Sequence, residues 1–451
     1  MNLAPATLGF TLPVFTADDA WTVATVACCA TACALLGCFL VLRRLSLLGD
    51  AISHAILPGL AAAFIITSSR GAIPMLVGAT VVGLITAVFS SAIHRWGRIP
   101  EDAAMGVVFT SLFAVGVILI TWGARDVDLD PGCVLYGVLE TIALHRVDVV
   151  GFSIPPAFVS LAVVLAVVVL VLTVAFKELK IVSFDAGLAA SLGFSVALIH
   201  YTFMGLVAAT TVVSFEAVGS ILVIVMLIAP AASAHLLTDR LSRMLWISAL
   251  IAIGACVAGY LLAVWVDTSV AGMISVVLFG VFILTSLLAP RYGVISKLAH
   301  RVRLAVRILG EDVLGMLYRW HERAALSGTA AVPPLSPADL RRGLQRPFLT
   351  RLALASLSRQ GLIERAATVS LTPRGMDAAR GIVRSHRLWE SFLAKHLGLP
   401  LDHLHEPSHR VEHFITAELQ SVLSREVGEG RDPHGSAIPG PGTASQQSQP
   451  S

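Results

Sequence analysis

The stretch "LSLLGDAISHAILPG" (residues 45–59) is apolar except for two ionisable side chains, Asp50 and His54. Residues four apart share one face of a helix, so this spacing places the carboxylate beside the imidazole. An aspartate at the centre of a membrane helix costs on the order of 2.5–3.5 kcal/mol and is usually kept for a function. Together the two groups are ordinary ligands of a divalent transition metal. On spacing alone, a metal contact and a structural role, with Asp50 capping the helix and His54 bonded to a neighbour, are equally good interpretations.

The sequence around this stretch predicts a membrane protein. Of the 451 residues, 56% are apolar and only 14% are charged, and the mean hydropathy is +0.81. Apolar stretches of about 20 residues, long enough to cross ~30 Å of hydrocarbon as helices, predict eight or nine transmembrane helices. They lie near residues 20–42, 51–67, 72–93, 101–122, 154–176, 194–213, 216–237, 244–266 and 270–290. The second of them is short enough to be re-entrant.

The distribution of charge predicts the orientation of this membrane domain, residues 1–290. With the N-terminus outside, ten basic residues fall in the inner loops and three in the outer loops, which is the usual asymmetry of membrane proteins. We therefore expect a multi-pass protein of the inner (plasma) membrane with its C-terminal region in the cytoplasm. The N-terminal sequence lacks a basic region before its first apolar run, so we do not expect a cleaved signal peptide.

After Pro290 the sequence changes character. Residues 1–290 carry a net charge of −4, whereas residues 291–451 carry +7. An amphipathic helix and a Pro-rich linker are expected at residues 291–335. Ser336 is placed to cap a helix, and "ERAATVSLTPRG" has the pattern of a small hairpin or wing. The last residues, 441–451, are of low complexity and are expected to be disordered.

The C-terminal region also contains a group of candidate metal ligands within "HRLWESFLAKHLGLPLDHLHEPSHRVEH" (386–413). His386 and Glu390 are four residues apart. His409, Glu412 and His413 share one helical face by the same rule, so each group can converge on one ion. A solvated polar face is the alternative interpretation of this pattern.

The membrane domain resembles the metal-ion permeases of ATP-binding-cassette importers, the family that imports manganese, zinc or iron. The resemblance begins with "RRLSLLGDAISHAILPGLAAAF". Three further stretches match in order: "DVDLDPGCVLYG" (126–137), "FKELKIVSFDAGLAASLGF" (176–194) and "SFEAVGSILVIVMLIAPAASAHLLTDR" (214–240). This resemblance to the permease family implies that Asp50 and His54 face the translocation path. It also implies an ATPase subunit that docks near Lys177–Asp185, an extracytoplasmic protein that delivers metal, and a permease homodimer.

The chain itself is not expected to be an enzyme. None of its four lysines follows a glycine, so the phosphate-binding motif G-x-x-x-x-G-K-[ST] is absent from the sequence. ATP hydrolysis therefore has to come from the separate ATPase partner.

The C-terminal region resembles the diphtheria-toxin-repressor family of iron- and manganese-dependent repressors, through "LASLSRQGLIERAATVSLTPRGMDAARGIVRSHRLWE" and the ligand-rich stretch after it. This implies a winged-helix region at 336–375 and a metal-binding and dimerisation domain at 376–440. By resemblance, one metal site uses His386, Glu390 and His405. The other uses His409, Glu412 and His413 with Asp312, and His409 stands where the family commonly has cysteine or a carboxylate. Nitrogen and oxygen ligands without thiolate suit manganese or iron(II) better than structural zinc.

The expected fold is an all-α polytopic membrane domain followed by a cytoplasmic winged-helix and helical metal-binding domain. The expected function is a divalent-metal permease, with manganese favoured and zinc or iron as alternatives, carrying a fused metal sensor. The alternative is a membrane-anchored, metal-dependent transcription regulator. Arg351 and Arg359 favour DNA binding, whereas Pro347 at the start of the candidate recognition helix weakens it.

Overall fold

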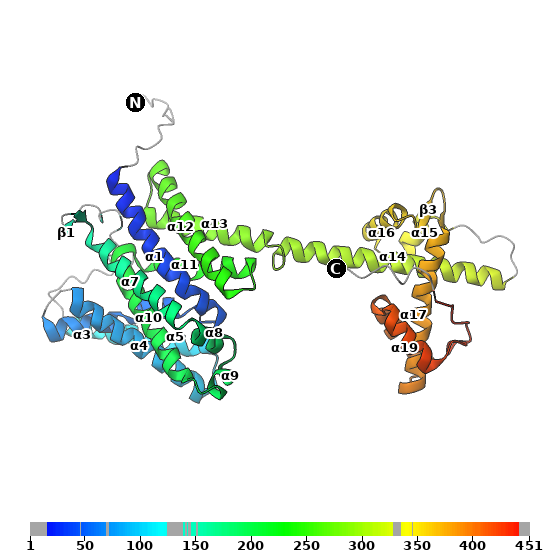
Figure 1. Ribbon diagram of the computed structural model, residues 1–451, viewed down its shortest axis with the longest axis horizontal. Helices are drawn as coiled ribbons and strands as arrows, with labels where there is room; N and C mark the ends of the chain where they lie inside the picture. Colours follow the sequence, from blue (N-terminus) through cyan, green and yellow to red (C-terminus); the bar gives the residue numbers. More distant parts are fainter. Residues whose placement is uncertain are drawn as a thin grey trace, which may run out of the picture. The chain divides into compact units, whose positions relative to one another are not determined.

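The computed structural model describes residues 16–45, 47–68, 72–123, 139, 142, 146–149, 152–327, 335–344 and 346–441. The motif at 126–137, most of the Pro-rich linker and the low-complexity end from residue 442 lie outside the described residues. The chain divides into two compact units, Met1–Ser296 and Lys297–Ser451, and the division falls in the first turn of α14 (Figure 1).

The first unit is built almost entirely of helices. Its elements are α1 (Ala17–Leu42), α2 (Leu48–Ala55), α3 (Leu57–Thr67), α4 (Ala72–Gly97), α5 (Glu101–Gly123), β1 (Val147–Val149), β2 (Phe152–Ile154), α7 (Pro156–Val174), α8 (Phe176–Phe184), α9 (Ala186–Ser191), α10 (Val196–Val218), α11 (Ser220–Leu237), α12 (Leu241–Val266) and α13 (Val270–Leu288). Within the described residues, nine helical stretches are long and apolar enough to cross a membrane. The predicted helical, multi-pass fold is therefore confirmed.

Helix α1 lies at the centre of this unit, against α7, α11 and α12 (Figure 1). Its buried side is rich in small residues, which let neighbouring helix backbones approach closely in a membrane. The closest approach is at Gly37. A Cβ atom on this residue would lie only 1.8 Å from the carbonyl oxygen of Leu227 in α11. Glycine is therefore required here for α1 and α11 to pack as they do.

The second predicted membrane segment is interrupted. Helix α2 ends at Ala55 and α3 begins at Leu57, with Pro58 in its first turn, where a missing amide hydrogen is tolerated. Beyond the break, Gly59 of α3 packs on Gly78 of α4 so closely that a Cβ on either would lie 2.4 Å from the other's carbonyl oxygen. The two helices together, Leu48–Thr67, are long enough for one span, and the break confines Asp50 and His54 to the short helix α2.

The second unit contains helices and a small hairpin. Its elements are α14 (Val294–Leu326), α15 (Pro337–Gly343), α16 (Pro347–Arg359), β3 (Ile363–Arg365), β4 (Val369–Leu371), α17 (Pro373–Leu397), η2 (Leu401–His403), α18 (His405–Val411), η3 (Glu412–Phe414) and α19 (Ala417–Val427). Side chains of α14, α16 and the hairpin share one core with α17, whose centre is formed by Val313, Leu314, Leu317, Leu354, Leu357, Ile363, Val369 and Ala379.

Several local predictions for this unit are confirmed. Ser336 caps α15 in a capping box with Asp339. The hairpin is antiparallel, with Ile363 opposite Leu371. Gly398, which adopts φ +59°, ends α17 and separates it from the shorter helices that follow. The order of α15, α16 and the hairpin is compatible with a winged helix, which stays a prediction.

Candidate metal sites

In the first unit, Asp50 and His54 lie side by side on α2, as their spacing predicts. The distance from Asp50 Oδ1 to His54 Nε2 is 3.6 Å, and both side chains are partly exposed. Asp50 does not cap the helix, because the N-cap position is Leu47 and no side chain bonds there. The ring of His54 stacks on Phe109 and meets the edge of Phe113, both from α5. The capping alternative is therefore wrong, and the pair presents one carboxylate and one imidazole next to an aromatic wall.

The segment Lys177–Asp185 folds as helix α8 and the start of α9. Asp185 accepts a hydrogen bond from the amide of Leu188 at 2.9 Å and so caps α9. Arg43, at the end of α1, donates to Ser183 at 2.9 Å and fastens α8 to the bundle. Phe184 and Leu188 are exposed, at 62% and 50%. Two short helices that present apolar side chains are better suited to docking a partner than a merely solvated loop would be.

In the second unit, the first predicted cluster forms a compact triangle. His386 and Glu390 lie one turn apart on α17, and the turn at Gly398 brings His405 of α18 back against them. His386 Nε2 lies 3.0 Å from Glu390 Oε1 and 3.1 Å from His405 Nδ1. The third side, from His405 Nδ1 to Glu390 Oε1, is 3.2 Å. Neighbouring ligands about 2.1 Å from an octahedral ion would be about 3.0 Å apart, so these three atoms fit one face of such a site.

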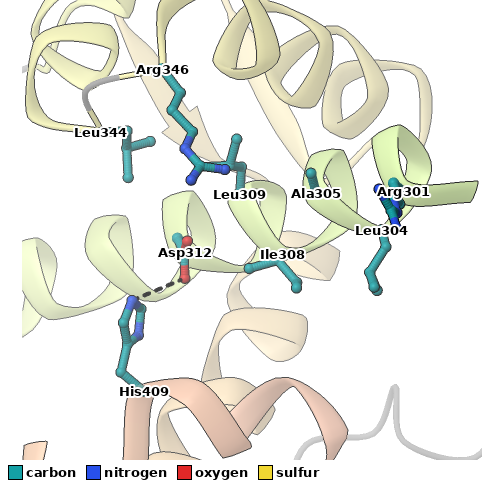
Figure 2. A pocket seen from close by; sticks show the side chains of 9 residues that line it. All are labelled: Arg301, Leu304, Ala305, Ile308, Leu309, Asp312, Leu344, Arg346 and His409. Carbon is teal, nitrogen blue, oxygen red and sulfur yellow. Dashed lines mark ion pairs between the residues drawn. The ribbon is translucent and has the colours of Figure 1, made fainter. Parts of the chain in front are cut away.

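The second cluster borders a cavity of about 630 Å³ next to α14 (Figure 2). Asp312 of α14 and His409 of α18 lie next to each other in its wall, with 3.8 Å between Asp312 Oδ1 and His409 Nε2. Other lining residues are Arg301, Leu304, Ala305, Ile308, Leu309, Leu344 and Arg346. Because His409 is about half exposed, the cavity gives an ion from solution a direct approach to these two ligands.

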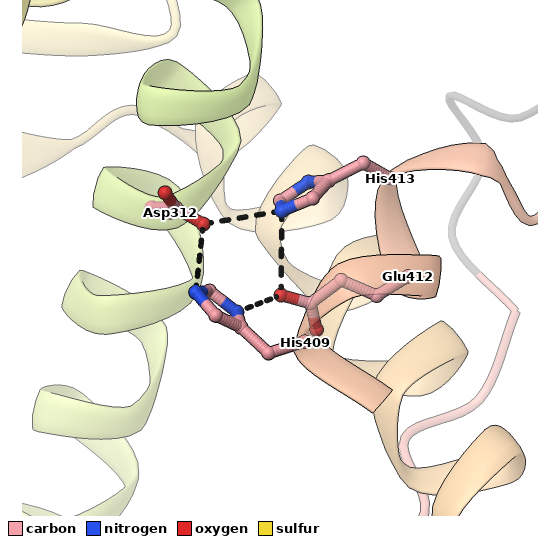
Figure 3. A group of neighbouring side chains, drawn as sticks. All are labelled: Asp312, His409, Glu412 and His413. Carbon is pink, nitrogen blue, oxygen red and sulfur yellow. Dashed lines mark hydrogen bonds and ion pairs between the residues drawn. The ribbon is translucent and has the colours of Figure 1, made fainter. Parts of the chain in front are cut away.

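Two further residues, Glu412 and His413 of η3, complete this cluster (Figure 3). His413 Nε2 lies 3.2 Å from Asp312 Oδ1 and 3.7 Å from Glu412 Oε1. Glu412 Oε1 is also 2.8 Å from His409 Nδ1. One ligand atom from each of the four residues lies within 4.8 Å of the others. The helix α14 thus supplies Asp312 to a set that α18 and η3 otherwise provide.

Glu412 contacts both clusters. Its Oε1 belongs to the second cluster, whereas its Oε2 lies 2.6 Å from His386 Nδ1. A carboxylate on the far nitrogen of a ligating histidine fixes the tautomer and directs the other nitrogen to the metal. Glu311 has the same relation to His413, with 2.8 Å between its Oε2 and His413 Nδ1. Both rings are therefore oriented with Nε2 toward the ligand sites.

The electrostatics of the two clusters favour charged side chains in the absence of a cation. Burial opposes charge on His386, but Glu390 and Glu412 outweigh it and raise the pKa of His386 to about 9. Burial is likewise outweighed at His413, where Asp312 and Glu311 raise the pKa to about 9. Burial would raise the pKa of Glu412, yet His386 and His409 lower it to about 2. Protons thus hold these ligand sets together and must leave when a metal binds.

Sequence reasoning missed two polar residues at these sites, Glu311 and His434. His434 Nε2 lies 4.0 Å from Glu390 Oε1, at the edge of the first cluster. Its loop is held in place by Asp432, which accepts hydrogen bonds from the amides of His434 and Ser436 and pairs with Arg387 of α17. The stretch "DPHGSAIP" (432–439) contains the turn residues and the histidine of this loop, and Glu311 stands directly beside Asp312 in the sequence.

A bundle of apolar helices with an aspartate–histidine pair, joined to a unit with two clusters of nitrogen and oxygen side chains, is a polytopic membrane protein with candidate sites for divalent metal ions. The chain belongs to the ABC 3 transport family, whose family model matches residues 19–289. Residues 372–440 match the iron dependent repressor, metal binding and dimerisation domain. Both resemblances indicated by the sequence motifs are confirmed, and the chain is a transport subunit of the permease type.

Individual relatives support this assignment. The chain is 45% identical over 280 residues to the manganese transport system membrane protein MntD of Bacillus subtilis, covering 62% of this chain and 95% of that protein. It is 36% identical over 355 residues to the zinc transport system membrane protein TroD of Treponema pallidum, covering 78% and 95%. Among solved structures, PsaBC from Streptococcus pneumoniae in complex with Fab matches with a TM-score of 0.51 and 31% identity, covering 61% and 94%.

Proposed function

We propose that this protein is the membrane permease of an ATP-driven importer of divalent transition metal, and that its C-terminal unit senses the same class of ion. The observation that carries the proposal is the aspartate–histidine pair of α2 in a permease-family bundle, combined in one chain with two convergent ligand clusters. The aspartate–histidine pair offers a contact for an ion in transit. The two ligand clusters offer sites at which an ion is held.

Manganese is the favoured ion. The described clusters contain only nitrogen and oxygen ligands, which suit manganese or iron(II), and the triangle of His386, Glu390 and His405 has the spacing of an octahedral face. The names of the relatives point to manganese in one case and to zinc in the other. Zinc and iron therefore remain the competitors to be tested against manganese.

The proposed assembly includes two kinds of partner and a second permease copy. Helices α8 and α9, with exposed Phe184 and Leu188, are the proposed docking site of the ATPase subunit. An extracytoplasmic metal-binding protein delivers the ion to the opposite face. In this arrangement the N-terminus is outside and the C-terminal unit is cytoplasmic, in agreement with the distribution of basic residues. The domain limits proposed are 1–290, 291–335, 336–375, 376–440 and 441–451.

The transport claim is tested by metal uptake in cells that express the chain with its ATPase and binding-protein partners. Asp50→Ala plus His54→Ala is expected to abolish uptake of radioactive manganese while the protein remains in the membrane. Ser53→Ala, between the two on the same helix, is the matched control and should leave uptake nearly unchanged. Uptake that survives the double substitution contradicts the proposed path. Competition by zinc and iron(II) in the same assay ranks the three ions.

A second candidate function is metal-dependent DNA binding by the C-terminal unit. The observation in its favour is α16, where Arg351 and Arg359 are exposed on a helix that is followed by a hairpin. In the first turn, however, α16 exposes Phe348 and begins at Pro347, so fewer polar groups are available to read bases. A gel-shift assay of the full chain with promoter fragments of its partner genes, with and without manganese, tests this alternative. Absence of any metal-dependent shift contradicts it.

A further inference from the structure

The beginning of α14, residues 294–308, belongs to neither matched family region, since these end at residue 289 and begin at residue 372. From Leu309 onward, α14 buries side chains in the core of the second unit. Between Val294 and Ile308 it buries none. These fifteen residues of regular helix therefore stay largely exposed, and only the side chains of Arg301, Leu304, Ala305 and Ile308 line the cavity next to His409.

This segment is strongly amphipathic. Val294, Leu298, Val302 and Ala305 recur at intervals of three and four residues and form one apolar face, and Leu298 is 60% exposed. Arg301 borders this face directly, and the other basic side chains of the segment, Lys297, His300, Arg303 and Arg307, lie around the rest of the helix. The sequence contains no acidic residue between Arg291 and Gly310. An exposed apolar stripe bordered only by positive charge matches a surface that is apolar beneath and negatively charged at its boundary.

The start of the segment is fixed at the ends of three membrane helices. Helix α13 ends at Leu288, and α14 begins six residues later, at Val294. Within this short turn, Tyr292 Oη donates to Asp239 Oδ1 at 2.7 Å, and Arg291 forms an ion pair with the same carboxylate. Asp239 lies between the end of α11 and the start of α12. The helix therefore leaves the bundle at the level where α11, α12 and α13 reach the membrane surface.

Aromatic side chains mark the same level. Tyr292 lies in the turn, and Trp246, 75% exposed, lies in the second turn of α12. Tyrosine and tryptophan are enriched where a membrane protein crosses the headgroup region. Two exposed aromatic side chains thus lie at this level, directly before the amphipathic basic segment.

We propose that residues 294–308 bind the headgroups of anionic lipids, with the apolar face against the acyl chains and the Lys and Arg side chains on the lipid phosphates. The negative leaflet complements a segment, residues 294–308, whose only charges are positive, and each such cation near an anionic surface strengthens binding roughly fivefold. The proposal rests on the transmembrane assignment but not on the identity of the transported ion. Lipid binding by this segment would act close to the second metal cluster, since Asp312 of that cluster lies one turn beyond the end of the segment on the same helix.

The test uses the full chain in lipid nanodiscs made either of phosphatidylcholine alone or of phosphatidylcholine mixed with phosphatidylglycerol. Trypsin cleavage after Arg301 is followed by mass spectrometry, with cleavage after Arg359 of α16 as an internal reference. Phosphatidylglycerol is expected to slow cleavage after Arg301 relative to Arg359, and raised salt should remove this protection because exposed charges are screened.

Two variants make the result specific. Lys297→Gln plus Arg303→Gln is expected to reduce the lipid-dependent protection by roughly 25-fold, from two lost cations. Arg319→Gln plus Arg323→Gln, on the same helix but in the part that packs within the second unit, is the matched control and should keep it. Cleavage that is equally fast in both lipids overturns the proposal. Slow cleavage that depends neither on phosphatidylglycerol nor on salt also overturns it, because a protein surface then covers the segment.

Discussion

Protons and metal ions are expected to compete for His386 and His413. The pKa of each ring is raised to about 9, so at pH 7 both are protonated in the metal-free protein. A ring must lose its Nε2 proton before it can bind a metal, which costs about 2.7 kcal/mol at pH 7, two pH units below its pKa. The affinity of each cluster should therefore rise about tenfold per pH unit between pH 7 and 9 and level off above pH 9.

Calorimetry on the full chain in nanodiscs measures this directly. Manganese is titrated at pH values of about 6.5, 7.5 and 8.5 in two buffers of different ionisation enthalpy, so that the protons released on binding are counted. At least one proton per cluster is expected at the lowest pH. His396→Ala, on α17 outside both clusters, is the control and should change neither affinity nor proton release. Affinity that is independent of pH, with no proton released, refutes the assigned ligands.

The ion pairs of His386, His413 and Glu412 also set how the stability of the metal-free protein depends on pH. Because the pKa of His386 and His413 is raised on folding, their contribution is full below about pH 6.5 and is lost as the pH rises through about 9. The pKa of Glu412 is lowered, so its contribution is present above about pH 4.5 and is lost as the pH falls through about 2. The C-terminal unit without metal should melt at the highest temperature in mildly acidic buffer, and added manganese should stabilise it most at alkaline pH.

Three substitutions test the packing and the support of the sites. Gly37→Ala forces a Cβ into a backbone carbonyl of α11 and should destabilise the bundle by about 1–3 kcal/mol in thermal melts, whereas Gly254→Ala, with open space around it, should be tolerated. Arg387→Ala removes the guanidinium partner of the buried Asp432 and the partly exposed Glu322 and should cost about 3–5 kcal/mol of stability of the second unit, against less than about 1 kcal/mol for the exposed Arg410→Ala. Glu311→Gln should weaken manganese binding at the second cluster about 10- to 100-fold in calorimetry, because Glu311 no longer orients the ring of His413. An unchanged affinity would show that Glu311 does not orient this ring for metal binding.

The membrane fold could be predicted closely from the sequence because its signal is local. Each span needs about 20 apolar residues in a row, and the chain provides them between short polar loops. The spacing of four residues, which is also a local signal, predicted that Asp50 lies beside His54. It did not reveal Phe109 and Phe113 against the imidazole, because these rings come from α5 and depend on how the helices pack.

The two ligand clusters of the C-terminal unit depend both on contacts between residues close in the sequence and on contacts between distant residues. Helical spacing brings His386 to Glu390 and groups His409, Glu412 and His413, but the contact of His413 with Glu311 joins residues 102 positions apart. No periodicity can show such an approach, and only the resemblance pointed to the adjacent Asp312.

The bridging role of Glu412 was also beyond the reach of sequence reasoning. Each of its two oxygens faces a different cluster, one in the direction of His409 and the other in the direction of His386. This geometry depends on the turn at Gly398, where a left-handed conformation reverses the chain and sets α18 against α17. A continuous helix through residue 398 would have separated the two groups of ligands.

The central claim is that one class of metal ion both passes the membrane domain and is sensed by the tail. The most direct test is manganese transport by the full importer in proteoliposomes, with increasing manganese on the side of the C-terminal unit. The transport rate of the wild type should change as the tail clusters fill. A variant with His409→Ala and His413→Ala should transport at a rate that no longer responds to that manganese. Identical responses of the two proteins would contradict the account.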